Sequence, residues 1–555
     1  MKDFSNEIRA QALRNALAFG KADAGRLLPK LFSYGLDKKD ISKVMPVIQE
    51  IVREVNGLSA QEKEQQFKRL EELIPEKIEK EKELPELVGA MKGKVITRIP
   101  PEPSKYLHIG HALSFLINYL EAERYGGKCL LRFEDANPEK CSQEYVDAIR
   151  ADLKEYLEIK TAGVRFVSDD MELFYDAAEK LIAKGAAYMC FCSQEDMREK
   201  RHTGKECSCR KESVQKTQEL WKSFVSGKFD EGKAVLRLKG DMAALNHTLR
   251  DPVLFRVSKT PHFRLKKKYC VWPVYDFYNP IEDSEMGVTH ILRSAEFEQR
   301  APLHDRLREL LGLKKPEIME YGRFGVIDAS TKGREVREGI EKGEYLGWDD
   351  PRLVTLKALR RRGISRDVLV ALAKQLSLSK KEVQIDFAMV AAMSRKLVDA
   401  ETERYYFVAD SIELEVSGAP KIQEVQIPVH PDSKKMRSVH VGKSIFIPEK
   451  DFEGERGKEI RLLHLYNVQL SAKGKKAVYT SSENKQLPRI QWVSEGVDVE
   501  IMMDDASIVS GVGEQAIADL KLGAVVQFER FGFVRLDAVI KKGKEKVYSF
   551  WFSHH

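Results

Sequence analysis

Two histidines lie where the chain changes from an extended path to a helical pattern. Prolines stiffen the approach to His108, and apolar residues spaced three and four apart follow His111. Backbone N–H groups are unpaired at a helix start, and the helix dipole favours anions there. Gly110, between the two imidazoles, removes a side chain that would block a flat base. The pattern predicts that this turn binds the phosphates of a nucleotide.

Four cysteines form a second group with chemistry of its own. Cys190 and Cys192 are separated from Cys207 and Cys209 by fourteen residues of polar chain. Four thiolates in two pairs suit tetrahedral zinc, and a site with only protein ligands would be structural. His202 could replace one sulfur, and reduced thiols or disulfides are the alternatives.

Bulk composition narrows the class of protein. The chain has 555 residues, 43% of them hydrophobic, which is too long for one core. A net charge of +7 permits a nucleic-acid partner without demonstrating one. The sequence has neither a signal-peptide pattern nor an apolar run that could span a bilayer. We therefore expect a cytoplasmic protein with no membrane association.

The elements that must position these residues change character along the chain. Residues 1–93 have a helical pattern and predict a helical N-terminal extension. A strand near residue 95, the helix after Gly110 and a strand over 129–138 predict parallel α/β layering. No G-x-G-x-x-G fingerprint follows the first strand, which argues against a nicotinamide cofactor. After residue 395, short β-branched and aromatic segments between turns predict β-barrels.

Longer stretches around these residues resemble one family. TRIPPEPSKYLHIGHA, LLRFEDANP, WPVYDFYNPIED, GVTHILRSAEF and GWDDPRLVTLKALRRRGI are similar to glutamyl-tRNA synthetases of the archaeal and eukaryotic type. These are class I aminoacyl-tRNA synthetases, whose HIGH signature is the quartet at His108. RKLVDAETERYYFVAD and GKEIRLLHLYNVQL resemble the C-terminal barrels of the same family.

The resemblance implies a multidomain α/β plus all-β architecture. A Rossmann-like catalytic domain would occupy 94–330, interrupted by an acceptor-binding insertion at about 188–262. A helical stem-contact domain would follow at 331–395, and two β-barrel anticodon-binding domains would occupy 396–555. Protein partners could contact the helical extension.

The activity implied is a ligase reaction on ATP, L-glutamate and tRNA(Glu). Glutamate would attack ATP to give glutamyl-adenylate, with Mg²⁺ holding the pyrophosphate, and the terminal adenosine of tRNA would then take the glutamyl group. Positive imidazoles would meet the charge on the phosphoryl oxygens. The family's KMSKS loop has only a partial match at Ser330-Thr331-Lys332. We expect the ATP-binding residues to be His108, Gly110, His111, Lys332 and, as a substitute cation, Arg334.

The choice of amino acid depends on Arg293, because a buried guanidinium would be left uncompensated by the neutral amide of glutamine. In glutaminyl relatives an uncharged residue normally occupies this position. Glu134 matches the residue that receives the α-ammonium group. The full predicted glutamate site is Arg98, Pro100, Glu102, Glu134, Tyr275, Asn279 and Arg293.

RNA contacts are predicted by residue type alone. Arginines on the strands of the insertion could hold the acceptor end, arginines after the stem leucines could bind phosphate, and polar residues of the barrels could read anticodon bases. The candidates are Arg237, Arg250, Asp251 and Arg256; Arg360, Arg361 and Arg362; and Arg489, Gln491 and Arg535.

Two other functions stay open at this point. A glutaminyl-tRNA synthetase would share most of these stretches, although Arg293 argues against it. An RNA-binding paralogue without activity is supported only by the irregular loop at Lys332. Whether tRNA(Gln) is also charged does not follow from the sequence.

Overall fold

A computed structural model of the chain describes residues 4–34, 36–37, 40–70, 73, 83–327, 329–376, 380–442, 444–543 and 545–555. The chain divides into two compact units, Met1–Lys82 and Glu83–His555. Leu84 and Leu87, which fall within the predicted extension, pack in the core of the second unit, where Arg124 donates to the Leu84 carbonyl at 2.7 Å. Within the described ranges, no helix is both long and apolar enough to cross a lipid bilayer.

The first unit is helical, as its pattern predicts. An apolar core that includes Ile8, Leu13 and Ile48 holds the helices together. Asn56 fixes the turn after the first helix, because its side chain both accepts from the Ala22 N–H (2.7 Å) and donates to the Ala22 carbonyl (3.0 Å). The helices are α1 (Ser5–Phe19), α2 (Ala24–Leu31), α3 (Ile41–Gly57) and α4 (Ala60–Leu70).

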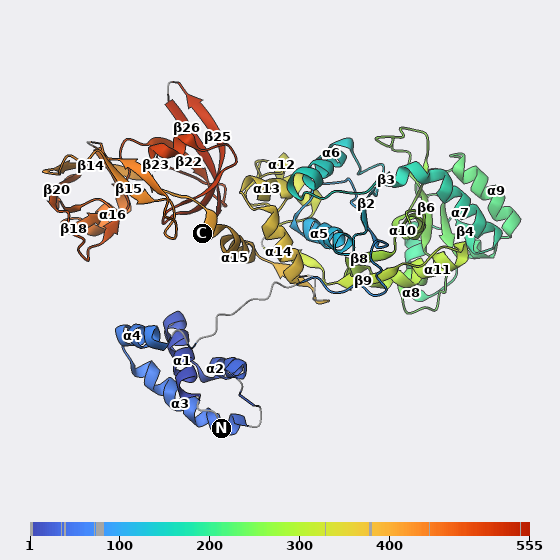
Figure 1. Cartoon of the computed structure of the whole chain (residues 1–555). Coiled ribbons are helices and arrows are strands. Elements are labelled where there is room, and N and C mark those ends of the chain that lie inside the picture. Colours follow the sequence, from blue (N-terminus) through green and yellow to red (C-terminus); the bar gives the residue numbers. More distant parts are fainter. Residues whose placement is uncertain are drawn as a thin grey trace. The chain divides into compact units, whose positions relative to one another are not determined.

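A parallel sheet forms the centre of the second unit (Figure 1). The Thr289 N–H donates to the Ile96 carbonyl at 2.9 Å and so joins two strand groups in the spatial order β3-β2-β1-β8-β9. The order reverses at β1, and ligands of such folds bind at the carboxyl ends of the strands there. The strands are β1 (Ile96–Ile99), β2 (Lys128–Phe133), β3 (Val164–Phe166), β8 (His290–Ser294) and β9 (Glu317–Tyr321).

Helices pack on both faces of this sheet, and the chain then forms a second, separate sheet in the insertion. Alternate residues of β1 face opposite sides: the Thr97 hydroxyl donates to the carbonyl of Asn118 in α5, and Arg98 contacts α10. The insertion is an antiparallel sheet whose core includes Trp221, Phe255 and Trp272. Its strands are β4 (Ala187–Cys190), β5 (Val235–Leu238), β6 (Val253–Val257) and β7 (Val271–Pro273), with α8 (Gln194–Thr203) and α9 (Val214–Val225) between the first two. The helices before and after it in the chain are α5 (Ile109–Arg124), α6 (Gln143–Ala151), α7 (Met171–Ala183), α10 (Tyr275–Glu285) and α11 (Ala301–Leu311).

The stem region packs against the catalytic sheet. Leu353, Leu356 and Leu359 are buried, which confirms that their spacing serves packing. Residues Leu356 and Leu359 share a core with α5 and the sheet. The elements are β10 (Phe324–Val326), which pairs with β11 (Val383–Ile385), and the helices α12 (Gly333–Glu341), α13 (Leu356–Arg361), α14 (Arg366–Leu376) and α15 (Phe387–Val398).

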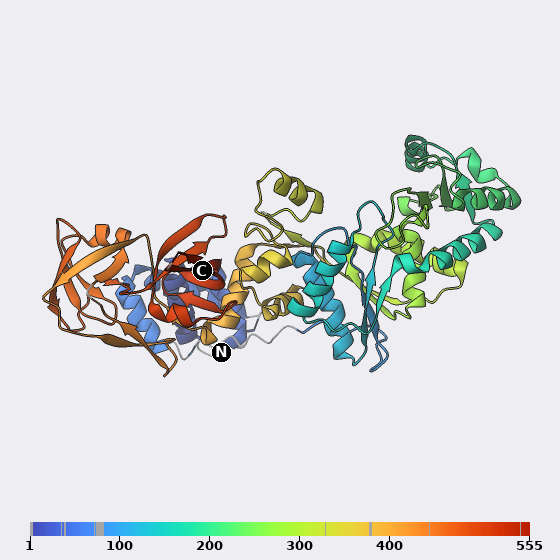
Figure 2. The ribbon, with the colours of Figure 1, turned by 90° about the horizontal axis from the view of Figure 1, so that it is seen from above.

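Two barrel-like sheets follow, and the strands of one are inserted in the sequence between the strands of the other. The seven-stranded sheet begins with two short strands and is completed by the last five strands of the chain, while a six-stranded sheet and a hairpin are inserted between. Figures 1 and 2 show the inserted sheet farther from α15 than the seven-stranded one. The strands are β12 (Arg404–Tyr405), β13 (Phe407–Ala409), β14 (Ser411–Ser417), β15 (Glu424–Pro428), β16 (Met436–His440), β17 (Ser444–Pro448), β18 (Glu459–Leu462), β19 (Asn467–Leu470), β20 (Lys476–Ser481), β21 (Arg489–Ile490), β22 (Val497–Met502), β23 (Ile508–Gly513), β24 (Val525–Phe528), β25 (Gly532–Lys542) and β26 (Glu545–His554), with α16 (Glu449–Glu455).

The arginines at the end of α13 attach the catalytic unit to the seven-stranded sheet. Buried Arg362 donates to the carbonyls of Phe552 (3.2 Å), Ser553 (2.8 Å) and Pro351 (3.1 Å), and burial lowers its pKa to about 10. Arg361 pairs with Asp537 at 2.8 Å. The expectation that these two are free for phosphate is wrong, because both cations are used at a domain contact.

The other arginines and the barrel candidates have mixed outcomes. Arg360 remains 46% exposed beside Glu155, so phosphate can still reach it. Gln491 is buried, which excludes direct contact with a base in this arrangement. Arg535 pairs with Asp537 at 3.0 Å close to Gly363, whereas Arg489 is exposed.

We expect Arg362→Met to reduce the free energy of unfolding by about 3 kcal/mol, because three carbonyls lose a buried charged donor. The matched variant Arg360→Met removes only a half-exposed ion pair and should cost less than about 1 kcal/mol. Urea unfolding followed by tryptophan fluorescence measures both. Equal losses would contradict the assigned role of Arg362.

Candidate active site

The histidine pair caps helix α5. His108 is the N-cap residue in an extended conformation, and its Nδ1 accepts from the Gly110 N–H at 3.2 Å. His111 reaches back, and its Nδ1 accepts from the His108 N–H at 3.2 Å. The ring centroids lie 3.8 Å apart. Each imidazole thus satisfies a backbone donor that a helix start otherwise leaves unpaired.

This arrangement determines the proton positions on both rings. Because each Nδ1 accepts a hydrogen bond, each neutral ring carries its proton on Nε2 and can donate from there. Burial, with the charges of Lys105 and Arg323, lowers the pKa of His108 to about 3, and burial lowers the pKa of His111 well below its ordinary value. The expectation of positively charged imidazoles is therefore wrong. Both are neutral hydrogen-bond donors near pH 7.

The stem segment around residues 354–356 and the strand β10 both contact the start of α5. The Ile109 N–H donates to the Val354 carbonyl at 3.0 Å, and the Leu356 N–H donates to the Leu107 carbonyl at 2.9 Å. A Cβ at Gly110 would lie 3.1 Å from the His108 ring and 3.3 Å from the Phe324 carbonyl. The glycine thus permits close approach of β10, in addition to any room it leaves for a base.

A buried charge network lies beside this turn, at the carboxyl ends of β1 and β2. Asp283 of α10 accepts from Arg98 at 3.2 Å and from Arg132 at 2.7 Å, and Arg132 also donates to Glu134 at 2.9 Å. Burial alone would raise the pKa of Asp283, but the two guanidinium groups hold it below its ordinary value. Asn279, with its amide oriented to suit its neighbours, donates to Asp283 (3.1 Å) and accepts from Arg132 (2.8 Å).

Arg293 completes the charged group from the next strand. It is 5% exposed, and its Nε and Nη2 donate to Oε1 of Glu320 at 3.2 and 3.0 Å. Burial and the charge of Glu134 raise the pKa of Tyr275, and the charges of Arg98 and Arg293 partly oppose this rise. Arg98, Glu134 and Arg293 thus all lie within electrostatic range of the Tyr275 hydroxyl, whereas Asn279 is fully buried within the network.

The loop before His108 places the remaining predicted lining residues. The Glu134 N–H donates to the Pro101 carbonyl at 2.9 Å, which brings Pro100 to the end of β2. Glu102 is exposed and accepts from the Ser104 hydroxyl at 2.9 Å. Its contact to a bound amino acid is not evident from this geometry.

The predicted lysine loop lies at the start of α12, away from direct contact with the histidines. Lys332 is 76% exposed and pairs with Glu335 at 2.7 Å, and Arg334 is 87% exposed and pairs with Glu338 at 2.7 Å. Lys105 ties this loop to the stretch before His108 by donating to the Thr331 carbonyl at 3.0 Å.

The four predicted cysteine sulfurs converge. Their Sγ atoms all lie within 4.8 Å of one another, and all seven cysteines of the chain are free thiols. The Sγ atoms of Cys190 and Cys207 are 3.8 Å apart. Two sulfurs bound to a tetrahedral zinc with bonds of about 2.3 Å would lie about 3.8 Å apart. Arg237 donates to Cys190 at 3.7 Å. His202 is not part of this cluster.

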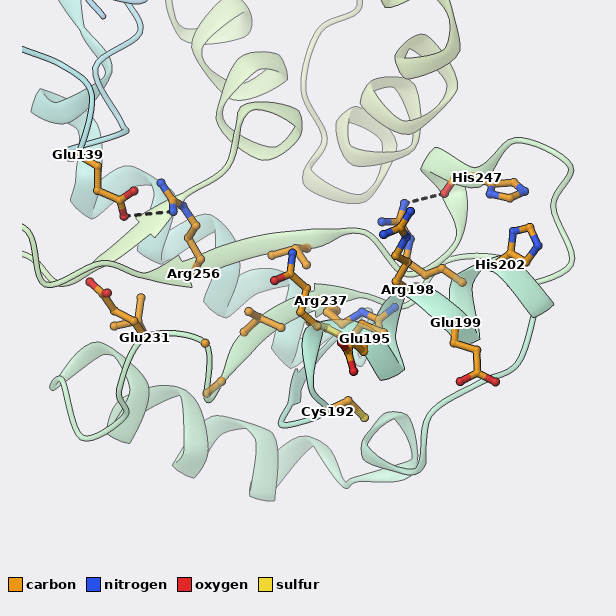
Figure 3. Close-up of a pocket in the computed structure, with 18 residues that line it drawn as sticks. Glu139, Cys192, Glu195, Arg198, Glu199, His202, Glu231, Arg237, His247 and Arg256 are labelled. Carbon is orange, nitrogen blue, oxygen red and sulfur yellow. Dashed lines mark hydrogen bonds and ion pairs between the residues drawn. The ribbon is translucent and has the colours of Figure 1, made fainter. Parts of the chain in front are cut away.

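A groove of about 1160 Å³ crosses the insertion beside these cysteines, with Arg198, His202, His247 and Arg256 on its walls (Figure 3). Of the four residues predicted to hold the acceptor end, all but Arg256 have structural roles that the sequence alone did not reveal. Arg237 and Asp251 are buried, and Arg250 donates to the carbonyls of residues 201, 202 and 244. Arg256 reaches the groove and donates to Asn137 at 2.9 Å.

Sequence reasoning missed the carboxylates that hold the arginines in place. Asp283 was detectable in principle, since it follows Asn279 by four residues and so shares its helical face. Glu320 was not, because its contact with Arg293 depends on the parallel register of β8 and β9, in which the two residues are direct partners.

Comparison with known families agrees with this geometry. The family model of the catalytic domain of class I tRNA synthetases (E and Q) matches residues 94–400. Two models of the anticodon-binding domain of the same group match residues 402–484 and 489–537. The chain belongs to the class I tRNA synthetases of the E and Q group, and it is therefore an aminoacyl-tRNA ligase.

Curated relatives match nearly the whole chain. The glutamate–tRNA ligase of Pyrococcus abyssi is 37% identical over 95% of this chain and 96% of its own length. That of Pyrococcus furiosus is 38% identical with the same coverage, and that of Methanobrevibacter smithii is 36% identical over 100% of both chains. A solved glutamate tRNA ligase from Elizabethkingia meningosepticum, in complex with its amino acid, is 20% identical with a TM-score of 0.39, covering 56% of this chain and 70% of that one.

The neutral state of the histidine pair is directly measurable. With histidine-selective ¹⁵N labelling, we expect the rings of His108 and His111 to stay neutral, with protonated Nε2, from pH 8 down to pH 5. Since their folded pKa values lie below 6.5, the stability they contribute is complete above pH 6.5 and is lost as pH falls toward 3. Titration of either ring near pH 6.5 would contradict the burial argument; Gln variants assign the signals.

Proposed function

We propose that the chain attaches L-glutamate to tRNA(Glu) in two steps, through glutamyl-adenylate. The observation that supports this most is that two buried arginines, Arg98 and Arg293, and the carboxylate of Glu134 all lie within electrostatic range of the Tyr275 hydroxyl. Glutamate carries two carboxylates and one ammonium group, which is the complementary charge pattern. The neighbouring α5 turn offers two neutral Nε2–H donors and a helix N-terminus to the phosphates of ATP.

In the first step, the chain's residues mainly orient the reactants. Glu134 would hold the α-ammonium group, which leaves the α-carboxylate free to attack the α-phosphorus of ATP and release pyrophosphate. His108 and His111 would donate to phosphoryl oxygens as negative charge develops there. Neutral donors fit this role, because their geometry is fixed by the backbone and needs no proton uptake. Alignment of the two reactants accounts for much of the rate.

The triphosphate needs cations, and the neutral histidines supply none. Within the described residues, the four cysteines are the only group of three or more ligating side chains close enough for one ion. Mg²⁺ would accordingly arrive with the ATP phosphates rather than in a dedicated protein cage, and would neutralise the departing pyrophosphate. Lys332 and Arg334, on the exposed start of α12, would approach the phosphates with their loop, with Lys105 as its tether.

Arg293 favours glutamate over glutamine. A glutamine amide would form a weaker hydrogen bond than a carboxylate with this guanidinium, which is 5% exposed and whose charge Glu320 already offsets, and this costs binding energy. A glutaminyl-tRNA synthetase is the second candidate, and no residue of the site supports it over glutamate. Charging of tRNA(Gln) as well as tRNA(Glu) would depend on the barrels and not on this pocket.

The tRNA would contact the insertion and the two barrels. Arg256 in the groove, Arg360 on α13 and Arg489 on the barrels are the predicted candidates whose side chains remain accessible. The helical N-terminal unit would serve protein partners. A ligase that acts on tRNA in protein biosynthesis would work in the cytoplasm, and we propose that location.

The cysteine cluster would hold a structural Zn²⁺. Cys190, Cys192, Cys207 and Cys209 supply all four ligands, so no position is open for a substrate. Hydrogen-bond donors surround the sulfurs: Tyr188 contacts Cys207 at 3.5 Å, and Lys200 contacts Cys192 at 3.8 Å. Such donors stabilise thiolate charge. The ion would fix the polar segment that includes α8 on one wall of the groove.

The activity is tested by charging separated tRNA pools with glutamate and with glutamine. We expect glutamate to be attached to tRNA(Glu), and Arg293→Ala to reduce kcat/KM for glutamate at least about 100-fold, because a desolvated charge pair is lost, while KM for ATP changes less than about threefold. Arg306→Ala, which removes an exposed arginine paired only with Glu309 on α11, is the control for general damage to the charge balance. Equal effects on glutamate and ATP would exclude Arg293 from side-chain recognition, and no charging at all would favour a non-catalytic paralogue.

The zinc proposal has its own measurement. We expect one Zn²⁺ per chain by elemental analysis of the purified protein, and less than about a tenth of that after Cys207→Ser and Cys209→Ser are combined. Cys270→Ser, a cysteine outside the cluster, is the matched control and should retain the metal. Protein purified without zinc whose stability does not respond to added Zn²⁺ would contradict the assignment.

A further inference from the structure

Both arginines of the glutamate site are already paired with a carboxylate of this chain. Arg98 donates to Asp283 through Nε, and Arg293 donates to Glu320 through Nε and Nη2. Asp283 is also held by Arg132, whereas among the described residues the Glu320 carboxylate has Arg293 as its only hydrogen-bond and ion-pair partner. Glu320 is thus the less constrained of the two counter-charges.

The position of Glu320 follows from strand register. Arg293 and Glu320 are direct partners in the parallel pair β8–β9, so their side chains emerge on the same face of the sheet. One oxygen, Oε1, accepts both contacts at 3.2 and 3.0 Å, and the carboxylate is only 15% exposed. Within the described part of the chain, Nη1 of Arg293 donates no hydrogen bond. The guanidinium therefore has one edge fixed by Glu320 and another edge open.

The charges of the site balance with Glu320 included. Three guanidinium groups, of Arg98, Arg132 and Arg293, face three carboxylates, of Glu134, Asp283 and Glu320. Two nearby charged side chains have partners of their own: Arg308 is paired with Asp305 at 3.0 Å, and buried Glu282, which lies near Arg132, is paired with Arg165 at 3.0 Å. The side-chain carboxylate of an incoming glutamate would bind Arg293 while the negative charge of Glu320 repels it. This repulsion is weakly screened because little water reaches the site. A neutral amide would experience no such repulsion.

We propose that Glu320 sets the affinity and selectivity for the substrate side chain by two opposing effects on Arg293. Its oxygen holds the guanidinium so that Nη1 faces the substrate, which favours glutamate. Its charge offsets that of Arg293, which weakens glutamate binding and narrows the preference over glutamine. Glu320 is a positioning residue that acts through Arg293. The proposal rests on the glutamate-ligase function proposed above and assigns this residue a role within it.

Two variants separate the effects. Glu320→Gln keeps an oxygen acceptor of the same reach and removes the charge, so KM for glutamate should fall about tenfold and inhibition by glutamine should weaken. Glu320→Asp keeps the charge and withdraws the oxygen by one methylene, so KM for glutamate should rise severalfold. Steady-state charging of tRNA(Glu) measures both, with KM for ATP as the internal reference.

Glu317→Gln on the same strand is the matched control, because Glu317 is exposed and its loss of charge should leave KM for glutamate unchanged. Thermal melting verifies that each variant is folded. A KM that rises or stays constant in Glu320→Gln, or that moves in the same direction in both variants, overturns the proposal and indicates a packing role. Failure of the unchanged enzyme to use glutamate would instead overturn the proposed function.

Discussion

The burial of Asp283 between two arginines is the interaction on which the site depends. Arg98 lies on β1, Arg132 lies on β2, and Asp283 lies on α10, so one carboxylate joins three elements. A guanidinium in this interior would be strongly unfavourable without an opposite charge within hydrogen-bond distance. Because Arg132 in turn holds Glu134, the same network fixes the carboxylate that we propose holds the α-ammonium group. The proposed selectivity for an acidic amino acid would thus depend on a structural ion pair.

The proposed nucleotide-binding turn at the start of α5 is held by backbone hydrogen bonds rather than by ion pairs. Neutral histidines cap α5, and the stem segment pairs with the residues around them, including a bridge between His108 and Thr355. Thr355 is also the N-cap of α13, a helix of six residues whose C-terminal end carries Arg361 and Arg362 into the seven-stranded sheet. One short helix therefore connects the histidine turn to the barrels through continuous contacts.

Much of the site was accessible from the sequence because its signals are local. The histidine quartet and the two cysteine pairs are defined by short spacings, and the helix after Gly110 follows from apolar periodicity. The charge of the histidines was not accessible, since it depends on burial by segments far along the chain. Arg361 was misassigned for a similar reason: its partner Asp537 is 176 residues away. Glu320 required the register of two parallel strands, which composition and spacing do not contain.

The central claim is that a buried guanidinium at position 293 recognises the side-chain carboxylate beside a nucleotide site built on α5. The most direct measurement is a crystal structure of the full chain with a non-hydrolysable glutamyl-adenylate analogue. The account predicts the γ-carboxylate within hydrogen-bond distance of Nη1 of Arg293, the α-ammonium on Glu134 and the phosphate near Nε2 of His108 and His111. A γ-carboxylate bound elsewhere, with Arg293 still contacting only Glu320, would contradict it.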